Sequence, residues 1–150
     1  MKKIIAASLV AGLFASTGVF AGGATTPTAK QLVDGYLSFR AGDATNINLA
    51  EQFAVTAIQG RTGFVKNNFE STLSANVAAG VSDLAGTNRF GAVAGSNKGY
   101  VVFTGSSVGG SVSQCGPQIA KTEALLAAKA VVTGTLNLAN ANGCGISTTP

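Results

Sequence analysis

Residues 89–104 carry the clearest local structural signal in this sequence. In the first half of the segment, Phe and Ala alternate with Gly and Val, and the second half is a β-branched and aromatic run, Tyr-Val-Val-Phe-Thr. A polar connection lies between them, in which Asn97 and Gly99 tolerate the positive φ that a tight turn needs. Two such runs around a short connection predict a β-hairpin, which we expect at the centre of an antiparallel sheet.

The chain contains two cysteines, Cys115 and Cys144, and each is followed by glycine. Two cysteines in an exported chain most often form one disulfide, and we expect that bridge here. On the loop-entropy account it would stabilise the fold by about 3 kcal/mol. The sequence leaves two alternatives open, namely a bridge between two copies of the chain and two free thiols.

Residues 1–21 have the pattern of a secretory signal peptide. Two lysines precede an almost wholly apolar or small stretch, residues 4–20, and Ala21 ends a cleavage site. The apolar stretch is too short for a membrane helix, and the processing site follows it at once. We expect cleavage near Ala21, which leaves residues 22–150 as a single domain that is secreted, periplasmic or on the cell surface, with no integral membrane span. A retained N-terminal anchor is the alternative.

The first stretch of this domain predicts a short helix over residues 27–40. Pro27 suits the first helical position, and Leu32 and Tyr36 fall on one helical face with their apolar neighbours. Gly35 weakens this prediction because glycine lowers helix stability.

The next stretch, residues 45–60, fits two templates, and its helical pattern covers residues 48–58. Asn48 and Glu51 have the spacing of a capping box, and apolar residues recur at helical intervals. Phe53 and Val55 also begin an alternation typical of a strand, but Glu51 interrupts it. We favour the helix.

Residues 64–85 are also ambiguous, and here we favour a strand. Apolar residues occupy odd positions and polar residues even ones over most of the stretch, which predicts one long half-buried strand. Four of the apolar residues, Phe69, Leu73, Val77 and Val81, also repeat every four positions, as in a helix.

After Cys115, an alanine-rich run with a proline near its start predicts a helix over residues 117–130. Residues 131–138 return to alternation and predict a strand. Together these patterns predict an α+β fold: an antiparallel sheet with the hairpin at its centre, one or two short helices and a C-terminal disulfide.

The chemistry available to the chain argues against an enzyme. The sequence contains no histidine, so the usual general base and the commonest transition-metal ligand are missing. The acidic residues are never closely paired and lack calcium-loop spacing; they are Asp34, Asp43, Glu51, Glu70, Asp83 and Glu123. We therefore predict no catalytic residue, no metal site and no cofactor.

Charged residues make up only 11% of the chain, against about a quarter in typical proteins. The chain has 10 Lys+Arg and 6 Asp+Glu, so removing the two lysines of the signal segment leaves 8 against 6, or +2. The basic residues are scattered singly, which argues against nucleic-acid binding. A surface with so little charge suggests either a secreted protein with a neutral polar surface or a subunit whose surface is covered by copies of itself or by another surface.

This composition resembles that of pilins and other surface-fibre subunits, although the N-terminal motif of type IV pilins is absent. The resemblance implies a structural, non-enzymatic subunit that self-associates into homo-oligomers or a surface assembly. The alternative is a monomeric periplasmic binding or inhibitory module. We expect the subunit to self-associate by strand pairing at an open sheet edge, and the alternative module to bind through the hairpin and the loop of residues 105–110. The candidate interaction residues are Asn97, Lys98, Tyr100 and Phe103.

Overall fold

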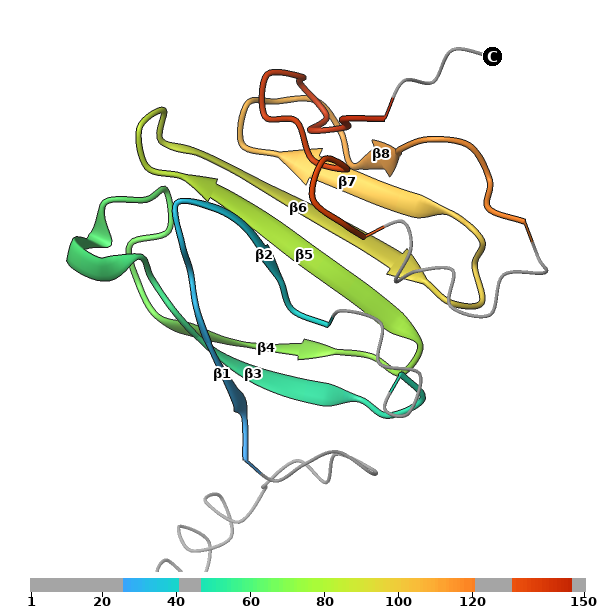
Figure 1. Cartoon of the computed structure of the whole chain (residues 1–150), viewed down its shortest axis with the longest axis horizontal. Helices are drawn as coiled ribbons and strands as arrows, with labels where there is room; N and C mark the ends of the chain where they lie inside the picture. The colour runs from blue at the N-terminus through green and yellow to red at the C-terminus, as the bar shows by residue number, and fades with distance from the viewer. Residues whose placement is uncertain (1–25, 41–46, 121–130, 147–150) are drawn as a thin grey trace, which may run out of the picture.

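The computed structural model describes residues 26–40, 47–120 and 131–146, and these residues form two β-sheets (Figure 1). The strands in chain order are β1 (Thr28–Gln31), β2 (Gly35–Ser38), β3 (Glu51–Thr56), β4 (Phe69–Leu73), β5 (Val77–Leu84), β6 (Arg89–Ser96), β7 (Val102–Ser106) and β8 (Ser113–Gln114).

The small sheet has three strands in the order β1-β3-β4, with β1 parallel and β4 antiparallel to β3. The large sheet has five strands in the order β2-β5-β6-β7-β8, and all neighbours are antiparallel. The chain therefore crosses between the sheets after β1, returns before β3, and crosses again after β4.

The predicted α+β class is wrong, because the described residues contain no α-helix and only a 3₁₀ turn at Gln59–Arg61 besides the strands. The stretch expected to form a helix over residues 27–40 forms β1 and β2 instead. Gly35 has φ of +135°, which ends any helix, and β2 pairs along its length with β5. Pairing in a sheet here overrides a weak helical pattern.

The helix expected over residues 48–58 is also wrong, because the segment forms β3. Phe53 and Val55 are buried on one face of that strand, so the alternation was the correct pattern. Glu51 belongs to the same face, and its carboxylate Oε2 accepts a hydrogen bond from Nε of the buried Arg40 at 3.3 Å. A charged residue at an inward position is therefore satisfied by a partner that the local pattern does not reveal.

The strand interpretation of residues 64–85 is correct in type but not in extent, because the stretch contains two strands. β4 and β5 are separated by residues 74–76, where Asn76 has φ of +62°. Leu73 and Val81 both pack on the core between the sheets. β4 and β5 belong to different sheets, but both turn their odd-numbered residues toward the interior between the sheets. A single alternating pattern therefore continues across the two strands.

The hairpin predicted over residues 89–104 is confirmed as β6 and β7, paired antiparallel from Gly91↔Ser106 to Gly95↔Val102. The turn differs in detail from the expectation. The residue with positive φ is Tyr100, at +58°, and neither Asn97 nor Gly99 adopts such a conformation.

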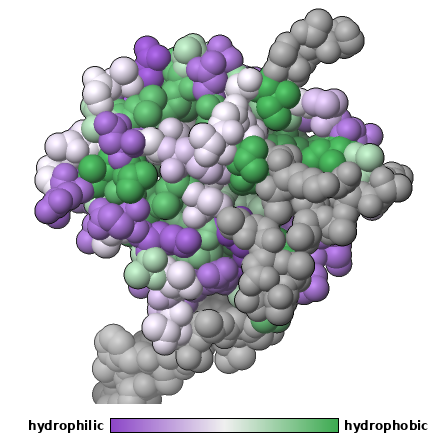
Figure 2. All heavy atoms as spheres, viewed as in Figure 1, coloured by the Kyte–Doolittle hydropathy of each residue, from purple (hydrophilic) through white to green (hydrophobic). Residues whose placement is uncertain are grey.

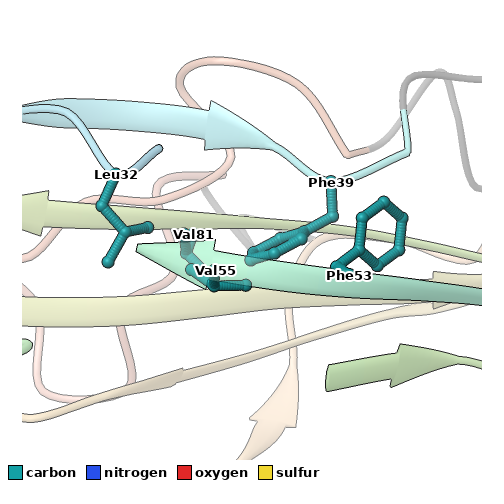
Figure 3. Close-up of a cluster of buried hydrophobic side chains, with 5 residues drawn as sticks. All are labelled: Leu32, Phe39, Phe53, Val55 and Val81. Atoms are coloured by element: carbon teal, nitrogen blue, oxygen red, sulfur yellow. The ribbon is translucent and has the colours of Figure 1, made fainter. Parts of the chain in front are cut away.

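The main core lies between the two sheets, where five buried side chains gather (Figure 3): Leu32, Phe39, Phe53, Val55 and Val81. Leu32 and Phe39 flank β2 at its two ends and point toward β3. The rings of Phe39 and Phe53 meet edge to face, with centroids 5.4 Å apart and planes at 73°. This geometry is favourable for aromatic pairs, so burial and ring contact together join the sheets.

The opposite face of the large sheet is covered by the C-terminal segment, residues 131–146, which lies across β6 and β7 (Figure 1). Val131 packs there with Ala78, Val93 and Val102. The expected strand over residues 131–138 is wrong, since only a single bridge forms, Leu136↔Cys144.

The helix predicted over residues 117–130 lies mostly outside the described residues. Its described part, residues 117–120, is not helical.

Candidate interaction surface

The face of the large sheet that meets the small sheet is only partly covered, and a hollow of about 350 Å³ lies on its outer half. The strands alternate, so Phe90, Ala92 and Ala94 of β6 share this face with Phe103 and Gly105 of β7. The residues that line the hollow are Phe90, Ala92, Val93, Ala94, Phe103, Thr104, Gly105, Ser106, Ser107 and Val112.

The small sheet covers this face of the large sheet only as far as β6. Phe90 packs against the core cluster between the sheets, whereas Ala92, one step further along the same face, is exposed. On β7, Phe103 remains 45% exposed, and Val112, which lies over Gly105, is 72% exposed. The small sheet thus shields the β2–β5 side of this face and leaves the β6–β7 side open.

The hollow is almost entirely apolar, and none of the described residues that line it is charged. Its serine hydroxyls are already engaged: Ser107 Oγ accepts from the Phe90 amide at 2.8 Å, and Ser106 Oγ accepts from the Val108 amide at 3.1 Å. Thr104 alternates with Phe103, so its buried side chain points to the opposite face. The surface therefore suits contact with another apolar surface rather than acid–base or nucleophilic chemistry.

The structure separates the four residues predicted to form an interaction surface. Asn97, Lys98 and Tyr100 lie in the connection between β6 and β7, and Phe103 lies in the hollow. Sequence reasoning missed Ala92 and Val112. The alternation along β6 was a usable signal for Ala92, but the partial cover by the small sheet was not visible in the sequence.

Arg40 is buried at the end of β2 and joins both sheets. Its Nη2 donates to the Leu49 carbonyl at 2.9 Å, and its Nη1 donates to the carbonyls of Ile47, Ser74 and Val77 at 3.3–3.4 Å. Together with the ion pair to Glu51, these bonds satisfy the guanidinium, which a buried cation requires. This cluster is a structural anchor where the chain crosses from β4 to β5.

Asp83 on β5 is fully buried, and its carboxylate receives two backbone amides from the β3–β4 connection. The Phe64 amide donates to Oδ1 at 2.6 Å and the Val65 amide donates to Oδ2 at 3.1 Å. The ring of Phe64 stacks on Phe90, with centroids 6.0 Å apart and planes at 20°. Asp83 therefore fixes a loop that adjoins the hollow through Phe90.

Among the described residues, no three side chains of His, Cys, Asp or Glu are grouped in a way that could hold a metal ion. The described part of the chain also has no helix with the length and hydrophobicity to cross a bilayer.

The predicted disulfide is confirmed between Cys115 and Cys144, whose Cα atoms are 5.3 Å apart. Both cysteines are buried. The bridge joins the end of β8 to the C-terminal segment and is compatible with an extracellular location.

No protein-family model matches the chain, and no significant match was found among curated proteins or among solved structures.

Proposed function

We propose that this protein is an exported, non-enzymatic structural subunit that self-associates through the apolar hollow on the large sheet. The observation that carries the proposal is the β6–β7 half of the sheet face, which the small sheet leaves open and whose described lining residues include no charged one. Contiguous exposed apolar surface of this kind marks interaction sites in soluble proteins.

A second copy of the chain is the occupant that fits these features best. Phe103 projects from β7 beside a floor of small residues, Ala92, Ala94 and Gly105. In a two-fold pairing, the Phe103 ring of each copy can enter the small-residue floor of the other, which gives a self-complementary contact. Because neither surface carries charge, the contact buries no unpaired ion.

The remaining surface is consistent with an exported protein of low charge. On the face drawn in Figure 2, apolar residues reach the surface in several separate areas between polar ones. The disulfide favours an oxidising compartment, in agreement with the signal peptide predicted over residues 1–21. Export remains part of the proposal.

Sedimentation velocity over a range of concentrations tests the association. We expect the purified chain beginning at Gly22 to form dimers or larger species as its concentration rises. Ala92→Glu places a charge in the hollow at an exposed position, so this variant should shift the population to monomers. Val33→Glu is the matched control, because Val33 is 45% exposed, like Phe103, but lies in the β1–β2 connection. A strictly monomeric wild-type protein at high concentration would reject the proposal.

The alternative, a monomeric binding module, is favoured by one feature, the size of the hollow. About 350 Å³ lies at the lower end of the range of small-molecule sites. A monomer whose melting temperature rises with 1-anilinonaphthalene-8-sulfonate, and does not rise in Ala92→Glu, would support this function instead.

A further inference from the structure

The connection between β3 and β4 contains a strap, residues 59–65, that is held to the large sheet by few contacts. The 3₁₀ turn Gln59–Arg61 contains no buried residue, and both Gly60 and Arg61 have positive φ, at +73° and +55°. Within the described residues, two hydrogen bonds join the strap to the large sheet, and both end on the carboxylate of Asp83.

Two apolar side chains add to this attachment. Phe64 stacks on Phe90 and is 42% exposed, and Val65 is partly buried against the core between the sheets. By contrast, β3 and β4 are joined to each other by a ladder from Glu51↔Leu73 to Val55↔Phe69. The strap can therefore separate from the large sheet without breaking either sheet, as a local opening with its own free energy.

We propose that Asp83 acts as a latch: its carboxylate holds the strap closed at the end of the hollow, and the strap opens when the Phe64 and Val65 amides leave that carboxylate. In the closed state, the carboxylate is removed from water and is compensated by two backbone amides. Opening returns the carboxylate and both amides to water, so the hydrogen bonds lost are largely replaced.

Gly63 of the strap lies very close to the Asp83 carboxylate. A Cβ at position 63 would lie 2.5–2.7 Å from the Asp83 carboxylate atoms, so only glycine allows the strap to seat. When the strap opens, Phe64 leaves Phe90, and the ring of Phe90 becomes accessible on a second side. The open state thereby extends the hollow toward the core between the sheets.

Amide hydrogen exchange tests the latch. In the wild type, we expect the amides of Phe64 and Val65 to exchange through a local opening, faster than the amides of β5. Asp83→Asn keeps the shape but removes the charge and replaces one acceptor by a donor, so exchange at both amides should rise at least tenfold with β6 unchanged. Asp34→Asn is the matched control, because Asp34 Oδ1 accepts one amide, that of Ala85, at 2.9 Å. It should leave Phe64 and Val65 unaffected.

Gly63→Ala displaces the strap while keeping the Asp83 charge. It tests the latch independently if Asp83→Asn fails to fold. It should produce the same rise at Phe64 and Val65. The experiments are repeated in the Ala92→Glu background, so a failure of the latch is distinguishable from a failure of self-association. Exchange of Phe64 and Val65 only at the rate of global unfolding, or no change in either variant, would overturn the proposal.

Discussion

Leu138 of the C-terminal segment lies directly against Gly91 of β6, in the space that a side chain at position 91 would occupy. The same arrangement recurs four residues away, where a Cβ at Gly95 would lie 3.6 Å from Cγ2 of Val131 and 3.1 Å from Cγ2 of Val102. The segment forms no strand pairing with β6. Close packing, the hydrogen bond from Arg89 Nη1 to the Leu138 carbonyl at 3.0 Å and the disulfide hold it against the sheet. Glycines on one face of β6 make this close packing sterically feasible.

Gly91→Ala should therefore destabilise the protein by about 1–3 kcal/mol, because the added methyl group overlaps Leu138 Cδ2 and the segment must shift. Urea unfolding measures the change in free energy of unfolding. Gly86→Ala is the control, since a Cβ at Gly86 meets no atom within 4 Å. Equal stability of the two variants would contradict the close packing described here.

Removal of the Arg40 side chain should be among the most damaging substitutions. Arg40→Ala leaves several buried backbone carbonyls and Glu51 without their partner, and a loss of about 3–5 kcal/mol is expected. Glu51→Gln should be milder, because Glu51 is partly exposed and makes one bond to Arg40. The exposed Lys98 serves as the control, with Lys98→Ala changing the midpoint of urea unfolding little. A ranking with Glu51→Gln as the worst variant would refute this assignment.

Loss of the disulfide should weaken the C-terminal cover. Cys115 and Cys144 are 29 residues apart, and a loop of that length corresponds to about 3–4 kcal/mol on the loop-entropy account. The Cys115→Ala/Cys144→Ala double variant should show this loss in urea unfolding, with faster amide exchange at Val93 and Val102. An unchanged unfolding midpoint would show that the segment stays in place without the bridge.

Tyr36→Phe should leave stability unchanged or raise it by at most about 1 kcal/mol. The Tyr36 hydroxyl is buried beside Gly80 and has no hydrogen-bond partner among the described residues, so its removal gives up no bond. Burial also raises the pKa of the phenol above its usual value of 10.0.

The raised pKa adds a pH dependence to this prediction. Above about pH 10 the unfolded state loses the Tyr36 proton more readily than the folded state, so wild-type stability falls as the pH rises. Tyr36→Phe should lose less stability between pH 9 and pH 11 in thermal unfolding. A parallel decline in both proteins would exclude Tyr36 as a source.

The features that depend on local sequence pattern were predicted correctly. The predictions failed where contacts between distant residues determine the secondary structure. The hairpin of β6 and β7 and the pairing of Cys115 with Cys144 are confirmed, because alternation and cysteine count carry that information directly. The helices expected over residues 27–40 and 48–58 are wrong. In both places the backbone is satisfied by strands far along the chain, and Glu51 is satisfied by Arg40.

The predicted interaction residues all belong to the β6–β7 hairpin, but the structure does not bring them together. Phe103 lies in the hollow, whereas Asn97 and Lys98 lie at the turn. Which face of β7 is open depends on how far the small sheet extends over the large one. That extent follows from the crossings between sheets, and no local pattern of residues reports it.

The two short crossings, residues 32–34 after β1 and residues 74–76 after β4, have a consequence for how the chain acquires its structure. Because each sheet takes strands from both sides of the other, neither can assemble from a contiguous piece of chain. Each sheet needs one pairing between strands that are not consecutive, β1 with β3 and β2 with β5, and such pairings slow folding. During synthesis, a chain can accordingly complete the small sheet once β4 has emerged, whereas β2 stays without its partner until β5 follows.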